Sequence, residues 1–216
     1  ESTWTFNTIK DDPDSWGGDS GKYGGGGGWM PGTYDESTNT YFFGTSNPAP
    51  DYDWGAVKGG IATDGARPGD NLYTSSVLAL DPDTGKIKWY HQEVPHDDWD
   101  YDSALGEFML LDRDNKKLVV HQNKSGLVFV YNREDGKIEN VWNMIENFNW
   151  IESVNPKTGE LIGRNPPNIA ENKDLILCPW IAGGRSWHSG SYSPKTGLWY
   201  NSAAEACQTT TVRKED

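Results

Sequence analysis

Residues 95–102, PHDDWDYD, place four aspartates beside a histidine and two aromatic residues within eight positions. Carboxylates this close repel one another and raise one another's pKa values. Taken alone, the run has two interpretations. It is either a solvated acidic turn or a place where several carboxylates meet a cation, and the rest of the chain has to decide between them.

The composition narrows the class of protein. The chain has 216 residues and a net charge of −13, which argues against a nucleic-acid partner because phosphate binding needs clustered lysine and arginine. No stretch approaches the roughly 18 apolar residues of a membrane span. Turn residues recur along the whole chain together with eleven tryptophans, a pattern typical of an all-β protein with many short strands.

One strand–turn–strand pattern repeats. Residues 78–92, LALDPDTGKIKWYHQ, alternate inward-facing apolar residues on both sides of a tight turn. Related stretches occur at residues 33–44, 130–142, 153–163 and 191–201. The turns of 33–44, 78–92, 130–142 and 191–201 follow one another at intervals of 46, 51 and 61 residues. Hairpins at this period predict the blades of a β-propeller, with a β-sandwich that reuses one turn as the alternative.

The repeat predicts about four blades in a single domain, residues 1–216. The opening STWTFNTI resembles the middle of a strand, so we expect blades to be missing at both ends. Residues 51–71 form a Gly-rich loop of the kind that covers a binding site. Residues 143–150 through 165–175 are expected to form a loop or short-helix insertion, and nothing predicts a long helix.

The chain as a whole resembles the quinoprotein alcohol and methanol dehydrogenases, which are eight-bladed propellers that bind pyrroloquinoline quinone (PQQ) and a metal. ALDPDTGKIKW (79–89) resembles their tryptophan-docking motif, and GTSNPAP (44–50), RPGDNLYTSSVLALD (67–81) and PHDDWDYD follow in the family's order. The resemblance covers the central part of such an enzyme. The family's glutamate metal ligand, adjacent-cysteine ring and quinone-carboxylate-binding arginine belong to its earlier part.

The resemblance assigns roles to individual residues. Trp29, after a run of glycines, corresponds to the indole beneath the planar quinone; an indole is a flat apolar platform, and glycines allow close backbone approach. Asn47 corresponds to an amide metal ligand, although NPAP alone is an ordinary turn. Asp100 corresponds to the catalytic aspartate beside metal and quinone. Lys124 corresponds to a cation that contacts the reactive quinone oxygens. Ser186 stands where the family often has asparagine.

Asp102 lies two positions beyond Asp100. Lanthanide-dependent methanol dehydrogenases carry an aspartate there and calcium-dependent ones usually a small neutral residue, so DYD resembles the lanthanide form. In an extended segment residues i and i+2 point to the same side and can face one ion. The alternative is that Asp102 faces water. The resemblance thus implies a lanthanide(III) or calcium ion held by Asn47, Asp100 and Asp102.

Two cysteines, Cys178 and Cys207, are too few for a disulfide scaffold and lack metal-finger spacing. By themselves they are either two unrelated thiols or one disulfide, and a disulfide implies an oxidising compartment. They correspond to a pair that is bonded in methanol dehydrogenases, which favours the disulfide and a periplasmic location. The four histidines lack metal-site spacing, and His96 is expected to support the site from outside or to lie at the surface.

These residues lead to a functional prediction. The chain is expected to belong to an enzyme that uses PQQ and a metal to oxidise methanol or another small primary alcohol to the aldehyde, with Asp100 as general base. A periplasmic cytochrome c is the expected electron acceptor, and other chains or further blades complete the ring. The alternative is a non-catalytic propeller, a scaffold or binding module of the outer-membrane assembly type.

Overall fold

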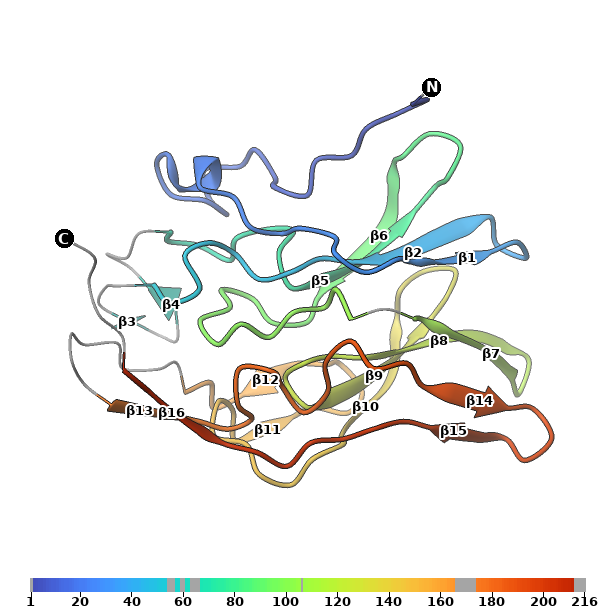
Figure 1. Cartoon of the computed structure of the whole chain (residues 1–216). Helices are drawn as coiled ribbons and strands as arrows, with labels where there is room; N and C mark the ends of the chain where they lie inside the picture. Colours follow the sequence, from blue (N-terminus) through green and yellow to red (C-terminus); the bar gives the residue numbers. More distant parts are fainter. Residues whose placement is uncertain are drawn as a thin grey trace.

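The computed structural model describes residues 2–53, 57–58, 61–62, 67–105, 107–165 and 174–211, in which short β-strands alternate with turns and loops (Figure 1). One turn of 3-10 helix, η1 (Ser20–Lys22), precedes the strands. Two antiparallel four-stranded sheets dominate. The first, in the order β1-β2-β5-β6, contains β1 (Thr33–Asp35), β2 (Thr40–Gly44), β5 (Ser76–Leu80) and β6 (Ile87–Gln92). The second, in the order β10-β9-β8-β7, contains β7 (Met109–Arg113), β8 (Lys116–Gln122), β9 (Leu127–Asn132) and β10 (Ile138–Asn143).

The remaining strands pair two by two in antiparallel fashion. The pairs are β3 (Val57–Lys58) with β4 (Ile61–Ala62), β11 (Ser153–Val154) with β12 (Leu161–Ile162), β13 (Asp174–Leu177) with β16 (Gln208–Thr211), and β14 (Ser191–Ser193) with β15 (Leu198–Tyr200). All five hairpins expected from the repeat are present, as β1–β2, β5–β6, β9–β10, β11–β12 and β14–β15. The prediction of an all-β partial propeller is confirmed.

A sixth hairpin, β7–β8, escaped the sequence analysis. Its turn consists of Asp114 and Asn115, which both have positive φ (51° and 60°). A two-residue turn with both residues in this conformation matches the twist of the flanking strands, and aspartate and asparagine tolerate it better than most residues. The signal in the sequence was therefore the pair DN, because this turn, like the β1–β2 turn, contains no glycine.

Two segments differ from expectation or fall partly outside the described residues. Residues 2–9 form no strand, contrary to the interpretation of STWTFNTI; instead the indole of Trp4 packs on the turn of the β5–β6 hairpin. The loop expected after residue 143 begins where β10 ends, but residues 166–173 lie outside the described part and Asp174 already belongs to β13. Of the Gly-rich loop 51–71, residues 54–56, 59–60 and 63–66 are likewise outside it.

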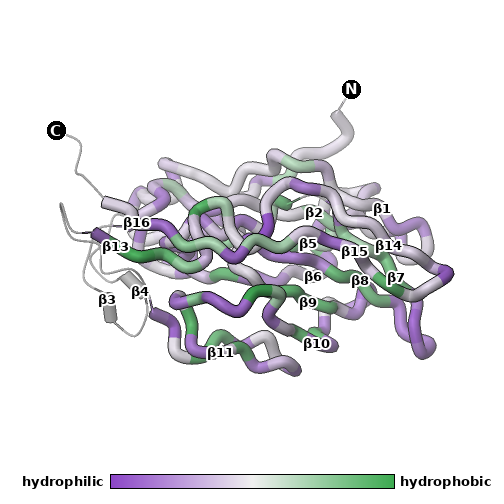
Figure 2. The backbone as a smooth tube through the Cα atoms, turned by 60° about the horizontal axis from the view of Figure 1, so that its bottom comes forward, coloured by the Kyte–Doolittle hydropathy of each residue, from purple (hydrophilic) through white to green (hydrophobic). Residues whose placement is uncertain are grey.

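Trp89 on β6 joins the two large sheets. Its side chain is only 7% exposed and lies between Phe42 and Tyr131, with ring centroids 5.7 and 5.6 Å away. Its Nε1 donates a hydrogen bond of 3.0 Å to the carbonyl oxygen of Arg133 in the β9–β10 turn of the second sheet. A Cβ on Gly136 would lie 2.5 Å from the indole, so this turn requires glycine. Hydrophobic residues line β9 at this interface (Figure 2).

The same docking recurs along the chain. A Cβ on Gly85 would lie 2.5 Å from the indole of Trp4, whose Nε1 donates to the carbonyl of Pro82 at 2.7 Å. A Cβ on Gly159 would lie 2.3 Å from Cδ1 of Ile138. In each case a bulky side chain covers the glycine turn of a hairpin that lies later in the chain. The repeat in the sequence therefore corresponds to a repeated contact between hairpins.

Replacing Trp89 by alanine should destabilise the full-length protein by roughly 3–5 kcal/mol, because it removes a buried aromatic side chain and leaves a cavity between the sheets. Denaturant unfolding measures this loss. Trp142→Ala is the matched control, because that side chain is 40% exposed on β10 and should cost under about 1 kcal/mol. A Trp89→Ala loss as small as the control's would show that the interface does not depend on the indole.

Cys178 and Cys207 form a disulfide with Cα atoms 4.5 Å apart, which confirms the expected pairing. The bond closes the segment that runs from the end of β13 to the start of β16. Cys178 and Cys207 are thus both oxidised, and no described cysteine is free. Among the described residues, no helix has the length and apolar character to cross a membrane.

Candidate metal and quinone site

The predicted site residues lie on loops that follow equivalent strands of the two sheets. Asn47 lies three positions after β2, the second strand of the first sheet, and Lys124 lies two positions after β8, the second strand of the other. Asp100 and Asp102 lie on the connection from β6 to β7, which links the sheets. The repeat thus brings residues far apart in the sequence to neighbouring loops.

Lys124 lies between two carboxylates. Its Nζ is 2.9 Å from Asp100 Oδ1 and 2.9 Å from Asp102 Oδ2. The lysine and Asp102 are buried, and Asp100 is largely so. Two carboxylates that face one buried ammonium form a cation-binding arrangement made of this chain's own groups.

Burial and neighbouring charges together set the pKa values of this group. Burial is the main cause that raises the pKa of Asp100 to about 8; Lys124 opposes the rise and Asp102 adds to it. For Lys124, burial would lower the pKa, but the negative charges of Asp102 and Asp100 outweigh it and raise the pKa. The ammonium is therefore held in its charged form, while Asp100 is a carboxyl group with unusually high proton affinity.

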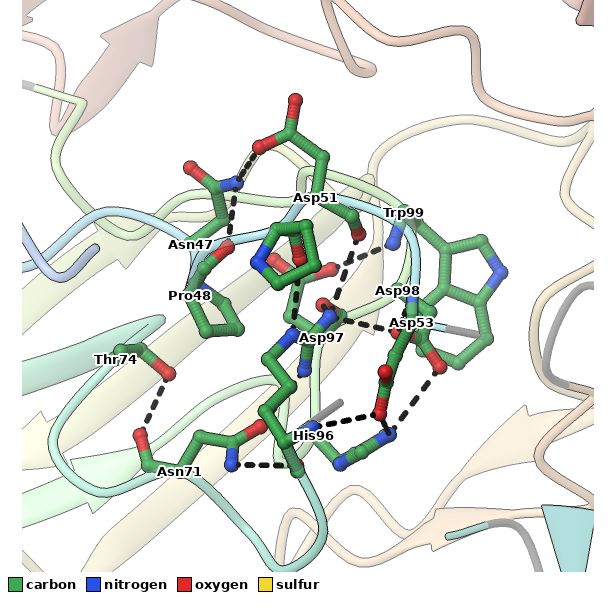
Figure 3. A network of polar contacts seen from close by, with 12 residues as sticks. Asn47, Pro48, Asp51, Asp53, Asn71, Thr74, His96, Asp97, Asp98 and Trp99 are labelled. Carbon is green, nitrogen blue, oxygen red and sulfur yellow. Dashed lines mark hydrogen bonds and ion pairs between the residues drawn. The ribbon is translucent and has the colours of Figure 1, made fainter. Parts of the chain in front are cut away.

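Asn47 is tied to the same cluster through its backbone. Its N–H donates to Asp102 Oδ1 at 2.8 Å. Its side-chain Nδ2 donates to Asp51 Oδ1 at 2.7 Å and to the carbonyl of Pro48 at 3.1 Å, as Figure 3 shows. Among the described residues no donor reaches its Oδ1, so this oxygen remains available to a cation.

The expectation that Asp100 and Asp102 lie in an extended segment is wrong. Asp100 has a φ of 64°, in the left-handed region, and the segment forms no strand. Both carboxylates still face one cation, the Lys124 ammonium, because the turn at Asp100 redirects its side chain. The alternative that Asp102 faces water is wrong, since Asp102 is buried.

Trp29 reaches the neighbourhood through the glycine run that precedes it. Gly26 N–H donates to the carbonyl of Asn47 at 2.9 Å, and Ser46 N–H donates to the carbonyl of Gly27 at 2.9 Å. Gly25 has a φ of 95°, and a Cβ there would collide with the Asn47 carbonyl at 2.6 Å. The glycines therefore permit close approach to the Asn47 loop. The Trp29 indole is 46% exposed, and its convergence with the other residues on one cavity stays a prediction.

Ser186 belongs to a segment that packs against Lys124. Gly184 N–H donates to the carbonyl of Lys124 at 2.8 Å. Gly183 has a φ of 78°, and a Cβ there would lie 2.2 Å from Lys124 Cγ. The backbone two and three residues before Ser186 is thus in contact with the site, whereas Ser186 itself, partly buried, makes no hydrogen bond that would define a role.

The acidic run PHDDWDYD is not a solvated turn, because its members are largely buried. Asp97 accepts hydrogen bonds from the backbone N–H groups of Trp99 at 2.9 Å and Tyr101 at 2.7 Å. Burial raises the pKa of Asp97 to about 6. Asp98 pairs with buried Arg67 at 2.7 Å. His96 is buried rather than at the surface, and its Nδ1 is 2.7 Å from the carbonyl of Gly69. Asp97 and Asp98 therefore have partners of their own, whereas Asp100 and Asp102 share Lys124.

A second buried carboxylate supports the site from behind. Glu93, at the end of β6, lies 2.9 Å from His121 Nδ1 and accepts from Tyr131 Oη at 2.7 Å. It also accepts from Ser103 Oγ at 2.7 Å and Asn123 Nδ2 at 2.9 Å. Ser103 follows Asp102 and Asn123 precedes Lys124, so Glu93 holds the two site loops together.

Sequence reasoning missed Glu93 and Arg67. Neither lies in a charged run, and a single glutamate or arginine in an acidic protein gives no sign of burial. The detectable signals were indirect: Glu93 follows the most regular hairpin of the chain, and Arg67 opens the stretch RPGDN, which we noted only for its resemblance.

The candidate ligands are oxygen atoms, the type of donor that hard cations prefer. Within the described part of the chain, no three histidine, cysteine, aspartate or glutamate side chains form a cluster that could hold a metal by themselves. The candidate donors are the carboxylates of Asp100 and Asp102 and the side-chain oxygen of Asn47. Oxygen donors of this kind are the type that calcium-sized ions prefer, and such ions take six to eight of them.

Comparison with known proteins agrees with this geometry. The profile described as "Glucose/ethanol/alcohol dehydrogenase, beta-propeller domain", a PQQ family, matches residues 1–148. The chain is 34% identical to a quinoprotein ethanol dehydrogenase of Pseudomonas aeruginosa over 84% of its length, and 34% identical to methanol dehydrogenase (cytochrome c) subunit 1 of Methylorubrum extorquens over 89%. It spans 30% of the length of each of these relatives.

Solved structures give the same result. A europium-containing methanol dehydrogenase superposes with a TM-score of 0.73 at 27% identity, covering 86% of this chain and 31% of the other. The quinohemoprotein alcohol dehydrogenase of Comamonas testosteroni superposes with a TM-score of 0.67 at 36% identity, covering 84% and 27%. Fold, sequence and arrangement of the site loops lead to one conclusion: the chain belongs to the β-propeller family of PQQ-dependent alcohol dehydrogenases.

Proposed function

We propose that the chain supplies most of the metal site and part of the quinone site of an enzyme that oxidises a small primary alcohol to the aldehyde. The observation that supports this most directly is the buried group of Asp100, Asp102 and Lys124, with 2.9 Å between the ammonium and each carboxylate. Membership of the family and the similarity to methanol and ethanol dehydrogenases agree with it.

The residues fit a metal ion. Asp100 and Asp102 are close enough that Asp102 raises the pKa of Asp100, in addition to the effect of burial. A multivalent cation would reverse that effect by favouring both ionised forms. Asn47 offers an amide oxygen that no described donor occupies. Asn47, Asp100 and Asp102 would therefore hold the ion, together with ligands from outside this group.

The residues also fit a planar quinone. The half-exposed indole of Trp29 provides a flat apolar surface, and Lys124 is a fixed cation for negatively polarised oxygens. Ser186 would contribute from the segment whose Gly184 N–H donates to the carbonyl of Lys124. When bound, PQQ would accept the two electrons of the alcohol, and the metal would act as a Lewis acid on its carbonyl group.

The chain's own groups would perform the proton transfer. Asp100 Oδ1 lies 2.9 Å from the Lys124 ammonium. The other carboxylate oxygen, Oδ2, would therefore take the hydroxyl proton of the alcohol. Glu93 and the hydrogen bonds of Asp97 keep this loop in place, so the carboxylate needs no reorganisation when the alcohol arrives.

The remaining roles follow from the relatives. One relative is named methanol dehydrogenase (cytochrome c) subunit 1, and we propose a cytochrome c as electron acceptor here. The Cys178–Cys207 disulfide supports an oxidising compartment, for which we propose the periplasm. A non-catalytic scaffold would not need a buried lysine held between two buried carboxylates, an arrangement that is costly to desolvate.

We further propose that the metal is a lanthanide. Asp102 is buried beside Asp100, and a trivalent ion of calcium-like size offsets one more carboxylate charge than a divalent ion does. One structural relative is a europium-containing methanol dehydrogenase. Asn47, Asp100 and Asp102 would then hold the ion, and the carboxylate of Asp102 would supply the additional negative charge that favours a lanthanide over calcium.

Reconstitution tests the function and the metal together. Full-length protein prepared with PQQ should oxidise methanol or ethanol with lanthanum or cerium, and much less with calcium. Asp102→Ala should weaken lanthanum binding by at least about tenfold and calcium binding less, as titration calorimetry would measure. Asp112→Ala, which removes an acid that is 74% exposed on β7, is the control. Equal reconstitution by both metals, unchanged in Asp102→Ala, would defeat the lanthanide assignment.

A further inference from the structure

Arg67 is a fully buried cation to which the proposed function gives no role. Its side chain is 0% exposed, and it lies between the loop that follows β2 and the loop that follows β6. Toward the first loop, Nε donates to the carbonyl of Pro50 at 2.9 Å and Nη2 to that of Asp51 at 3.3 Å. Toward the second, Nη2 donates to the carbonyl of Asp97 and to Asp98 Oδ1, both at 2.7 Å.

The first of these loops sets the orientation of the Asn47 side chain. Asp51, whose carbonyl Arg67 contacts, accepts the Asn47 Nδ2 hydrogen bond with its carboxylate at 2.7 Å. Figure 3 shows the Asp51 carboxylate turned toward the Asn47 amide, with Pro48 beside them. Because Nδ2 donates to Asp51 and Pro48, the amide oxygen points away from these two acceptors and its direction is fixed by them.

The second loop sets the position of Asp100. Asp98 is two residues before it, and the Asp97 carboxylate clasps the N–H groups on both sides of Asp100, those of Trp99 and Tyr101. Fixing the backbone at 97 and 98 therefore fixes the turn that contains Asp100. Arg67 does so through the carbonyl of Asp97 and the carboxylate of Asp98.

We propose that Arg67 is a positioning residue for the metal site: its guanidinium joins the Asn47 loop to the Asp100 loop and so sets the separation of these two metal ligands. The inference rests on the proposed function, because it assumes that Asn47 and Asp100 bind the same ion. Arg67 itself touches neither residue's side chain and acts only through Asp51, Asp97 and Asp98.

The chemistry of arginine suits this task. A guanidinium is planar and always charged, and its N–H donors diverge in a fixed fork. Here Nη1 adds a hydrogen bond of 2.7 Å to Asn71 Oδ1, whose own Nδ2 donates back to the carbonyl of Arg67 at 2.9 Å. The hydrogen bonds with Asn71 thus hold the guanidinium group of Arg67 in one orientation while it contacts both loops. A lysine would keep the charge beside Asp98, but its single nitrogen cannot replace the separate Nε, Nη1 and Nη2 donors that reach Pro50, Asn71 and Asp97.

The test compares Arg67→Lys with Arg133→Lys in the full-length protein. Arg133 is also a buried arginine, 4% exposed and paired with Asp35 at 3.2 Å, but it lies in the β9–β10 turn away from the site. Calorimetric titration with lanthanum and with calcium measures metal affinity without turnover. We expect Arg67→Lys to weaken metal binding by about 10- to 100-fold, and to lower kcat more than it changes KM. Arg133→Lys should leave metal affinity unchanged.

Asp51 gives a second test that leaves the buried ion pair intact, in case Arg67→Lys does not fold. Asp51 is exposed, so substitutions there should be tolerated. Asp51→Ala removes the acceptor that orients the Asn47 amide and should weaken lanthanum binding by about tenfold. Asp51→Asn keeps an acceptor oxygen and loses the charge, so it should restore most of the affinity if orientation rather than charge is responsible.

The outcomes separate this inference from the function beneath it. Wild-type metal affinity in Arg67→Lys or in Asp51→Ala, alongside a clear loss in Asn47→Ala, would overturn the positioning role and leave the metal site standing. An equal loss in Arg67→Lys and Arg133→Lys would also overturn it, because the effect would then be general destabilisation. Metal binding that is unaffected by Asn47→Ala would instead defeat the proposed site itself.

Discussion

Asp100→Asn should reduce alcohol oxidation by the full-length protein at least about 10³-fold, because an amide cannot take the hydroxyl proton and is a weaker ligand for a cation. Asparagine has nearly the same shape, and its amide oxygen can still accept a hydrogen bond from Lys124 Nζ, now 2.9 Å from Asp100 Oδ1. The fold should therefore persist. Alcohol-dependent dye reduction measures the activity, and circular dichroism checks the fold.

The control is Asp112→Asn, which removes one negative charge at the exposed edge of β7 and should leave activity unchanged. Addition of excess lanthanum separates the two roles of Asp100. If Asp100 were only a metal ligand, a high metal concentration would restore turnover; if it is the base, turnover stays low. Normal turnover by Asp100→Asn without added metal would refute the assignment of both roles.

The second large effect is expected at Glu93. Glu93→Leu should destabilise the protein by about 5 kcal/mol or more, because it leaves several buried donors without an acceptor. These donors belong to His121, Tyr131, Ser103 and Asn123. Glu93→Gln keeps the volume and one acceptor oxygen and should cost less. Denaturant unfolding of both variants gives the comparison, and similar stability of wild type and Glu93→Leu would contradict it.

The pH dependence of this loss follows from the pKa of Glu93. Burial alone would raise it, but His121 and the hydrogen bonds from Tyr131 and Ser103 lower the pKa overall. A carboxyl group with a lowered folded-state pKa contributes stability above its unfolded value, and this contribution is lost as the pH falls through the folded value. The difference in unfolding free energy between wild type and Glu93→Gln should thus be largest near neutral pH and shrink below about pH 4.

The sequence predicted those parts of the structure that repeat or lie close together in the chain. The hairpins followed from alternation around tight turns, and the docking of Trp89 was implied by the resemblance of residues 79–89 to the tryptophan-docking motif. The resemblance predicted Asn47, Asp100, Asp102 and Lys124, which the fold brings to neighbouring loops. Each of these signals is local: a turn, a spacing of two or a short motif.

The unpredicted parts depend on partners far along the chain. Glu93 meets Tyr131, 38 positions away, and Arg67 meets Asp98, 31 positions away. No spacing rule links such pairs, because their approach is decided by how the sheets pack. The left-handed turn at Asp100 was missed for a related reason: alternation suggested an extended segment, but the hydrogen bonds of Asp97 to the following N–H groups impose a turn instead.

The contacts between side chains and glycine turns all run in the same direction along the chain. Trp4 covers Gly85, Trp89 covers Gly136 and Ile138 covers Gly159, always from an earlier segment onto a later turn. In such an array each unit is stabilised mainly through its neighbours. A side chain added at Gly136 would therefore displace Trp89 and loosen the preceding sheet, while its own hairpin could keep its strand pairing. We therefore expect a substitution at a glycine turn to destabilise the segment that precedes it in the chain more than the hairpin that contains it.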